Sequence, residues 1–222
     1  MRILYDKERD FHPAYICGDT GKVYNATCGA PEPLACINTP GGGLIKQADV
    51  VLIYYPINVS TVPRHTQKND LDIYSRLTDI DGPAMTWMIH SIAYGDIGED
   101  DRAAAFFKKS YEGLVRGPFF VWHEGFNEFG GAPNFINGAG MHLMNVAAGY
   151  GGVRWLEGKL ELRRPRPPPN CTTLVLRRVF FRGARINLEA TASTWSVALD
   201  EPAPDGVVLQ LEAEGGKPAH TL

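Results

Sequence analysis

The run Pro165-Arg166-Pro167-Pro168-Pro169 divides the chain into two parts whose apolar residues repeat with different periods. Proline fixes its own φ angle and has no N–H to donate, so this run continues neither a helix nor a central strand. Before it, over residues 44–150, apolar side chains recur every three or four residues, which is the helical period. After it, residues 184–190 alternate between apolar and polar, as a half-buried strand requires. The sequence therefore predicts a mainly α part followed by a small antiparallel β module.

Four segments before the proline run carry helical signals. We expect one helix over 46–55, which Pro56 ends because proline lacks the N–H that a helix interior needs. A second helix follows Pro83, with apolar residues at spacings of three and four. A third begins at the acidic residues 99–101, because negative charge is favourable at a helix amino terminus. A fourth runs from about 138 to 148.

Three regions follow from these signals. Residues 1–43 form an irregular lead-in segment that is rich in glycine, proline and cysteine, and residues 44–158 form the helical part. Residues 159–222 form a linker and a small β domain. An irregular stretch as long as the lead-in is unusual in a compact domain, so we expect it to lie against something that this chain does not contain.

The β module is predicted to begin near Thr172. Leu174–Phe181 and the alternating segment 184–190 are separated by Arg182-Gly183, a pairing typical of a β-hairpin. Residues 207–211 alternate in the same way and predict a further strand.

Composition excludes several classes of function. The formal net charge of −3 gives no attraction to nucleic acid or to an anionic membrane. The longest apolar run, residues 50–57, is too short to cross a bilayer, and Met1–Asp10 lacks the apolar core of a signal peptide. Neither the histidines nor the cysteines have metal-ligand spacing, so we expect no metal and no other cofactor. The sequence predicts a soluble protein and leaves its compartment and oligomeric state open.

The first candidate site is Lys46-Gln47-Ala48-Asp49, which follows three glycines. Amine, amide and carboxylate groups at the start of a helix can hydrogen-bond to the hydroxyls of a sugar. The same residues also suit the exposed end of an ordinary amphipathic helix, and their chemistry alone favours that second interpretation.

The second candidate site is the segment 119–131, in which Glu124 and Glu128 lie among aromatic residues and glycines. Aromatic faces such as that of Trp122 can stack on sugar rings, and a carboxylate in apolar surroundings has an adjustable pKa for acid–base catalysis. The alternative is that the aromatic residues belong to the core and both glutamates are solvated. Residue types alone do not separate these two interpretations.

Taken in order, the motifs resemble glycoside hydrolase family sixty-five, and within it the acid-trehalase-like branch. The resemblance covers most of the chain, from about Leu4 to Leu211. Its most specific motif is Lys46-Gln47-Ala48-Asp49-Val50. The other matching segments are Leu4-Tyr5-Asp6 with His12-Pro13, Trp122-His123-Glu124, Pro133 to Gly140, Gly149 to Arg154, and Leu160 to Pro169 followed by Arg182-Gly183-Ala184-Arg185.

The resemblance implies a fold, an activity and site residues. The fold is an (α/α)6 barrel, of which this chain would hold a carboxy-terminal part, followed by the β module. The activity is the release of glucose from an α-glucoside, such as glucosyl-galactosyl-hydroxylysine of collagen type or a trehalose-like disaccharide, by an inverting mechanism with two carboxylates. Glu124 would be the general base, Lys46 and Gln47 would hold the glucosyl unit, and chemistry makes Trp122 a candidate stacking wall.

One part of the family pattern is missing. The general acid of the family lies upstream of the Lys-Gln motif, and nothing before Lys46 matches its segment. Glu8 and Glu32 lie in irregular sequence without the expected context. The simplest interpretation is that the chain is a carboxy-terminal fragment, and that the fragment alone is inactive.

Two other functions stay open. One is a non-catalytic carbohydrate-binding remnant that retains Lys46, Gln47 and Trp122. The other is a phosphorolytic enzyme of the same family. The resemblance implies that the phosphorylases hold phosphate with hydroxyl side chains in the stretch from Phe129 to Asn137. That stretch contains no serine or threonine here, which favours hydrolysis.

Overall fold

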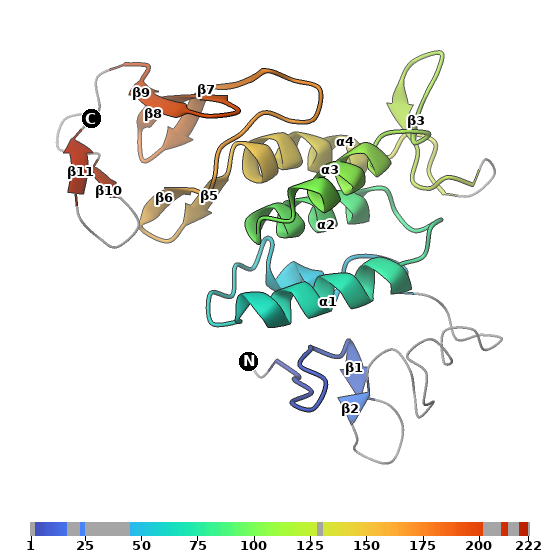
Figure 1. Ribbon diagram of the computed structural model, residues 1–222. Coiled ribbons are helices and arrows are strands. Elements are labelled where there is room, and N and C mark those ends of the chain that lie inside the picture. Colours follow the sequence, from blue (N-terminus) through green and yellow to red (C-terminus); the bar gives the residue numbers. More distant parts are fainter. Residues whose placement is uncertain are drawn as a thin grey trace. The chain divides into compact units, whose positions relative to one another are not determined.

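A computed structural model describes residues 3–16, 23–24, 45–127, 131–201, 210–212 and 218–221 (Figure 1). The chain divides into two compact units, Met1–Asn145 and Val146–Leu222. The described part of the first unit holds the α-helices, and that of the second holds small antiparallel sheets. The predicted combination of helices with antiparallel β structure is therefore confirmed.

Helix α2 (Met85–Asp96) lies at the centre of the first unit and contacts α1 (Arg64–Leu77), α3 (Asp100–Lys109) and α4 (Ile136–Met144) (Figure 1). All residues from Thr86 to Gly95 are buried. The predicted helix is thus present, but it is buried all round instead of along one stripe, as is typical of a helix with other elements on every side.

Helix α3 begins at Asp100, after the acidic residue Glu99, and ends with Lys108 and Lys109 in its last turn. Negative charge at the amino end and positive charge at the carboxyl end both oppose the partial charges of the helix dipole. The predicted start of this helix is confirmed.

The predicted helix over 46–55 is wrong. Only a short 3-10 turn, Val50–Ile53, forms there. Ile45 instead pairs with Thr78 as an isolated parallel bridge, with its N–H donating to the Leu77 carbonyl at 2.9 Å and its carbonyl accepting the Asp79 N–H at 2.8 Å. Because the backbone at the start of the motif pairs with another segment, it does not start a helix, and the buried side chains Val50 and Val51 fill the core from the turn.

Helix α1 was not among the expected helices. Its buried face carries Thr66, Asp70, Leu71, Tyr74 and Leu77, whose spacing is helical. Two of these residues are polar, so a search for apolar periodicity does not find the stripe.

The polar residues of α1 bind the amino-terminal segment 3–16. Asp70, which is fully buried, accepts the His12 N–H at 2.7 Å and hydrogen-bonds to His12 Nδ1 at 2.6 Å. The Tyr54 hydroxyl also donates to the Asp70 carboxylate, and the Tyr74 hydroxyl donates to the His12 carbonyl at 2.8 Å. Burial is the main cause that raises the pKa of Tyr54, and the negative charge of Asp70 raises it further. A buried carboxylate is tolerated when it is hydrogen-bonded in this way.

Helix α4 confirms the fourth predicted helix with different bounds. It runs from Ile136 to Met144 and continues as a π-helical turn, Asn145–Tyr150. Before it, the short hairpin of β3 (Val115–Arg116) and β4 (Val121–Trp122) leads into the segment of Glu124. Two-stranded pairing also joins β1 (Tyr15–Ile16) to β2 (Val23–Tyr24).

The second unit is built from antiparallel strands. The strands β5 (Val153–Leu156) and β6 (Lys159–Leu162) form a hairpin that sequence reasoning had not found. Gly152 precedes β5 with φ +68°, and a Cβ there would lie 2.1 Å from the Arg163 carbonyl oxygen, so only glycine fits this approach.

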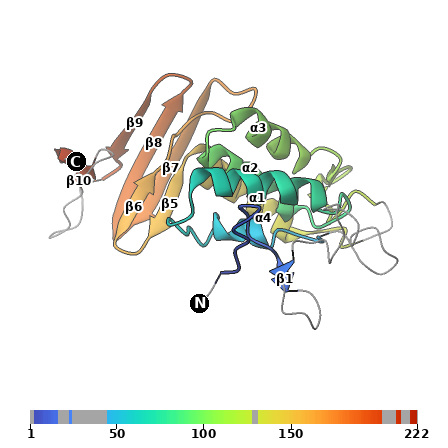
Figure 2. The ribbon, with the colours of Figure 1, turned by 60° about the horizontal axis from the view of Figure 1, so that its bottom comes forward.

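A three-stranded sheet follows the prolines in the order β7 (Thr173–Phe181), β8 (Ala184–Thr191) and β9 (Trp195–Leu199) (Figure 2). The predicted hairpin across Arg182-Gly183 is confirmed. Both turn residues have positive φ angles, +48° and +86°, as the two-residue turns that match strand twist require. The strands β10 (Gln210–Glu212) and β11 (Pro218–Thr221) pair with each other, and most of the predicted strand 207–211 lies outside the described residues.

Candidate active site

The loop Thr78–Ala84, called here the connecting loop, joins α1 to α2 and runs between the two candidate segments. On one side it pairs with Ile45, directly before Lys46 and Gln47. On the other side the Ala84 N–H donates to the Glu124 carbonyl at 2.6 Å. Motifs that are 78 residues apart in sequence therefore flank one short loop.

Two glycines allow this close approach. A Cβ on Gly82 would lie 2.2 Å from the Lys46 carbonyl oxygen, and a Cβ on Gly125 would lie 2.7 Å from the Asp81 carbonyl oxygen. Real Cβ atoms do not come this close to backbone oxygens, because packed interiors leave no room for such overlap. The connecting loop thus presses against the backbone of both candidate segments.

The Glu124 carboxylate is half-buried and is held by the chain that follows it. The Glu124 N–H donates to the Ala132 carbonyl at 3.0 Å, and the Ala132 N–H donates to Glu124 Oε2 at 2.9 Å. A Cβ on Gly131, where φ is +80°, would lie 2.7 Å from the Glu124 Cβ. A carboxylate that accepts a backbone N–H at fixed geometry is positioned before any ligand binds. The alternative candidate, Glu128, lies outside the described residues.

Lys46 and Gln47 are exposed, and neither side chain hydrogen-bonds to another residue in the described part of the chain. Gln47 lines a cavity of about 350 Å³ together with Met85, Ile89 and Met141. A second cavity, of about 540 Å³, shares Met85 and Met141 and is also lined by Asn137. The lining is mainly apolar, so in these cavities the amides of Gln47 and Asn137 supply the polar contacts.

Trp122 is half-buried and packed. Its Nε1–H donates to the Ser110 carbonyl at 2.9 Å, and its ring lies 5.1 Å from the ring of His142. It also packs against the buried cluster of Ala84, Trp87 and Leu114. Burial lowers the pKa of His142, so this ring is neutral at neutral pH. The structure therefore gives Trp122 a clear packing role beside Glu124, and its stacking on a sugar stays a prediction.

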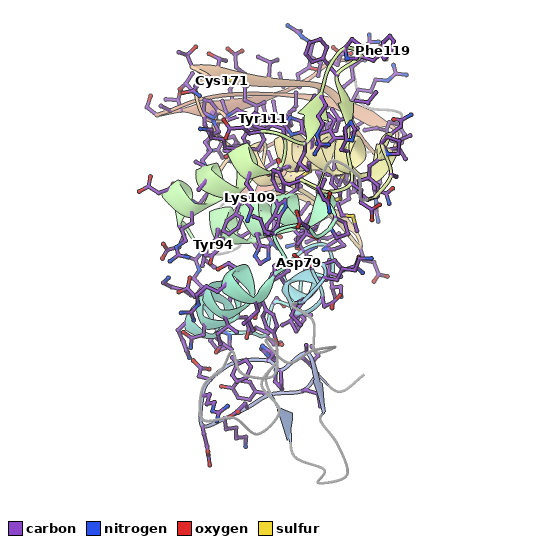
Figure 3. The ribbon with its side chains drawn as sticks, turned by 90° about the vertical axis from the view of Figure 1, so that its right-hand side faces the viewer. Asp79, Tyr94, Lys109, Tyr111, Phe119 and Cys171 are labelled. Atoms are coloured by element: carbon purple, nitrogen blue, oxygen red, sulfur yellow. The ribbon has the colours of Figure 1, made fainter. Side chains whose placement is uncertain are left out.

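The β3–β4 hairpin is fixed at its base and exposed at its tip. Arg116 holds the foot of the hairpin in place, because one Nη donates to the carbonyls of Gly125 and Phe126 at 3.0 and 2.9 Å. Phe119 and Phe120 form the tip, and Figure 3 shows Phe119 at its outer end.

Sequence reasoning missed two carboxylates. Asp79, which is labelled in Figure 3, and Asp81 both lie on the connecting loop between the candidate segments, and Asp79 Oδ1 accepts the Asp81 N–H at 3.0 Å. The pattern Asp-Ile-Asp-Gly-Pro, directly before a helix, is the signal that could have drawn attention to them. Of the two glutamates upstream of Lys46, neither of which the sequence supports as the acid, Glu8 lies in a turn capped by Asp6, and Glu32 lies outside the described residues.

Across the described ranges, no group of three or more histidine, cysteine, aspartate or glutamate side chains is placed to hold a metal ion. In the same ranges, no helix is long and apolar enough to cross a membrane.

Comparisons with known proteins show which class of protein the chain is related to. No protein-family model matches the sequence. Curated relatives are nevertheless glycosidases, and they match most of the chain. The chain is thus related to glycoside hydrolase family sixty-five through its acid-trehalase-like branch, and the resemblance seen in the motifs is confirmed.

Three relatives illustrate the relationship. Protein-glucosylgalactosylhydroxylysine glucosidase of Dictyostelium discoideum is 33 % identical over 186 residues, which is 84 % of this chain and 22 % of that protein. Acid trehalase of Emericella nidulans is 32 % identical over 74 % of this chain and 16 % of its own length. Kojibiose hydrolase of Mucilaginibacter mallensis is 41 % identical over 62 % of this chain and 20 % of its own length. The chain spans about a quarter or less of the length of these relatives.

A solved structure supports the fold. The chain resembles a protein assigned as a kojibiose phosphorylase from the human microbiome, with a TM-score of 0.64 at 16 % identity. The likeness covers 100 % of this chain and 29 % of that one. At this identity the likeness concerns the fold alone.

Proposed function

We propose that this chain is part of an inverting glycoside hydrolase that releases glucose from an α-glucoside. Residues 44–158 would be the carboxy-terminal part of an (α/α)6 barrel, and residues 159–222 a linker with a small β domain. The observation that carries the proposal is the connecting loop, which is flanked by Lys46 and Gln47 on one side and by Glu124 on the other. The names of the relatives, which include a glucosidase, a trehalase and a kojibiose hydrolase, support the same reaction class.

In the proposed mechanism Glu124 is the general base. It takes a proton from a water molecule as the water oxygen attacks the anomeric carbon, and the glycosidic bond breaks on the opposite face of the sugar. A carboxylic acid from outside this chain gives its proton to the leaving oxygen. In inverting enzymes the two carboxyl groups stand about 6.5–9.5 Å apart, which leaves room for the water.

Lys46 and Gln47 would bind the glucosyl unit. Their exposed side chains offer an ammonium group and an amide, which together supply donors and an acceptor for sugar hydroxyls. The bridge between Ile45 and Thr78 sets the position of their backbone. Trp122 would form the wall beside the sugar, in addition to its packing role.

The proposed substrate is a carbohydrate in which glucose is α-linked to a second group. The names of the relatives offer glucosyl-galactosyl-hydroxylysine, trehalose and kojibiose as candidates. For the first of these, the proposed carrier is hydroxylysine of collagen type. Hydrolysis is favoured over phosphorolysis because residues 129–137 contain no serine or threonine hydroxyl to hold phosphate.

The test compares the isolated 222-residue chain with the full-length protein that contains it. We expect the full-length protein to hydrolyse kojibiose or trehalose with no requirement for phosphate. From α-glucosyl fluoride, which has no aglycone sugar to add a second anomeric signal, it should release β-glucose first, as followed by proton NMR. The isolated chain should release no glucose from the disaccharides, because a positioned acid contributes about 10²–10⁴-fold and is missing from it. Initial release of α-glucose from α-glucosyl fluoride would contradict inversion, and phosphate-dependent release of glucose 1-phosphate from the disaccharides would identify a phosphorylase. Sugar binding without turnover by the full-length protein would identify a carbohydrate-binding remnant.

A further inference from the structure

The tip of the β3–β4 hairpin exposes two aromatic side chains that fill no part of the core. Phe119 exposes 84 % of its surface and Phe120 exposes 73 %, and Phe119 is the most exposed large apolar side chain in the described part of the chain. Folding gains little from rings that stay in water, because the hydrophobic contribution scales with the apolar area removed from it. Their place at the tip therefore calls for a reason other than stability.

The backbone at the tip is also held in an unfavourable conformation. Phe120 has a φ angle of +52°, which is the left-handed region that a bulky side chain rarely adopts. The turn Gly117–Phe120 keeps Phe120 in this conformation. Neither phenyl ring is buried, so packing of the side chains does not offset the cost. Strained residues of this kind gather at binding and catalytic sites, where the surrounding structure enforces the geometry.

The foot of the β3–β4 hairpin connects its tip to Glu124, the proposed general base. Arg116 Nη donates to the carbonyls of Gly125 and Phe126, the two residues that follow Glu124, and the His123 N–H donates to the Leu114 carbonyl at 2.7 Å. Phe120 precedes Glu124 by four residues, so its Cα lies within about 14 Å of the Glu124 Cα even in a fully extended chain. The foot of the hairpin is therefore held beside Glu124, and the backbone of the tip stays within that distance of it.

We infer that Phe119 and Phe120 form a platform that binds the sugar ring of the aglycone, the part of the α-glucoside that leaves. The inference rests on the proposed function, because it takes Glu124 as the reference point of the site. The turn Gly-Pro-Phe-Phe carries no charged side chain. Phenyl faces offer apolar surface to the C–H face of a neutral sugar, while the hydroxyls of that sugar stay in water.

The experiment uses the full-length protein and two substrates that share the glucosyl unit. Kojibiose has an aglycone sugar, whereas α-glucosyl fluoride has none. Phe119→Ala and Phe120→Ala should each raise the KM for kojibiose about five- to tenfold and leave the hydrolysis of α-glucosyl fluoride unchanged. Phe119→Trp should keep the kojibiose KM near its original value. Phe180→Ala, which removes an exposed phenylalanine on β7, is the matched control and should change neither substrate.

Two outcomes would overturn the inference. Unchanged KM values for kojibiose in both alanine variants would show that no aglycone sugar touches the tip. An equal loss on both substrates together with a lower melting temperature would show that another part of the protein, or a second copy, covers the rings. If the unsubstituted protein hydrolyses neither substrate, the proposed function fails. Saturation-transfer NMR between the phenyl protons and kojibiose then decides the inference, supporting it if transfer is seen and is lost in the double variant and overturning it if there is none.

Discussion

The two flanks of the connecting loop hold their candidate residues in different ways. On one flank, the Glu124 backbone bonds to Ala84 and Ala132, and its carboxylate accepts the Ala132 N–H. On the other flank, backbone hydrogen bonds hold Ile45, which directly precedes Lys46 and Gln47, and the side chains of these two residues are exposed. The comparison indicates that the carboxylate is positioned before a ligand arrives. If Lys46 and Gln47 bind the sugar as proposed, the sugar must order both side chains itself, at a cost of up to about 2 kcal/mol of side-chain entropy for each long side chain.

The largest effect is expected from Glu124→Gln in the full-length protein. The amide keeps the shape of the carboxylate but takes no proton from water, so kcat should fall by at least about 10²–10⁴-fold while the dissociation constant for the sugar stays nearly unchanged. Turnover and isothermal titration with the same disaccharide measure the two quantities. Glu112→Gln, on an exposed turn, is the control. Near-normal turnover in Glu124→Gln, with loss in Glu128→Gln, would reassign the base.

A smaller but still large effect is expected from Gly131→Ala, which tests whether the chain positions the carboxylate. The new Cβ would overlap the Glu124 side chain, and φ at this position is +80°. A displacement of about 1 Å can reduce the rate about 10²-fold, so kcat should fall by about 10- to 100-fold. Gly158→Ala is the matched control, because φ there is +82° and only the end of the Arg182 side chain, at 4.0 Å, lies near its Cβ. Equal kcat values for the two variants would show that Glu124 is not held in the way described.

Substitutions at Lys46 and Gln47, on the opposite flank, should have a weaker effect. That effect should fall on the dissociation constant for the sugar. Lys46→Ala and Gln47→Ala would each remove the hydrogen bonds proposed to hold the glucosyl unit, and each should weaken sugar binding about tenfold. Because both side chains are exposed, the melting temperature of the unliganded protein should not change. A fall in melting temperature for either variant would show that its side chain has a structural partner, and the contrast between the flanks would then be wrong.

The smallest expected effect is a dependence of stability on pH at the Glu124 flank. Burial lowers the pKa of His142, whose ring packs on Trp122. The unfolded chain therefore binds a proton on this residue at a higher pH than the folded chain does. The stabilisation is complete above the unfolded pKa of about 6.5 and is lost as the pH falls from there towards the folded pKa. His142→Phe should reduce the loss of stability between pH 7.5 and 5.5 in denaturant titrations, and an unchanged loss would exclude this residue as its source.

Sequence patterns predicted elements that follow an apolar period. They failed where buried polar residues interrupt that period and where the backbone pairs with a distant segment. The α2 segment and the hairpin across Arg182-Gly183 follow standard periods. Helix α1 was missed because Thr66 and Asp70 occupy its buried face. Residues 46–55 carry the apolar residues expected of a buried helix. Ile45, however, hydrogen-bonds to a distant segment, and a local sequence pattern contains no information about such a partner.

The candidate site shows the same limit. The motifs located Lys46, Gln47 and Glu124, but not the connecting loop that lies between them. Only the structure shows that Asp79 and Asp81 lie on that loop, between the two candidate segments. The apolar character of Trp122 suggested a sugar platform, whereas its Nε1–H bond to Ser110 and its buried neighbours give it a packing role first.

The Asp70 carboxylate helps to attach the amino-terminal segment to α1 by non-covalent bonds. Asp70 binds His12, and Asp10 accepts hydrogen bonds from Tyr5, Thr66 and Asn69. Residues 3–16 are thus attached to α1 by side-chain bonds as well as by the chain itself. A single cut between residues 25 and 44 should therefore yield a nicked protein whose two pieces co-elute on gel filtration and part only in denaturant. The short piece, made as a synthetic peptide, should then restore a chain that lacks it, as in fragment complementation.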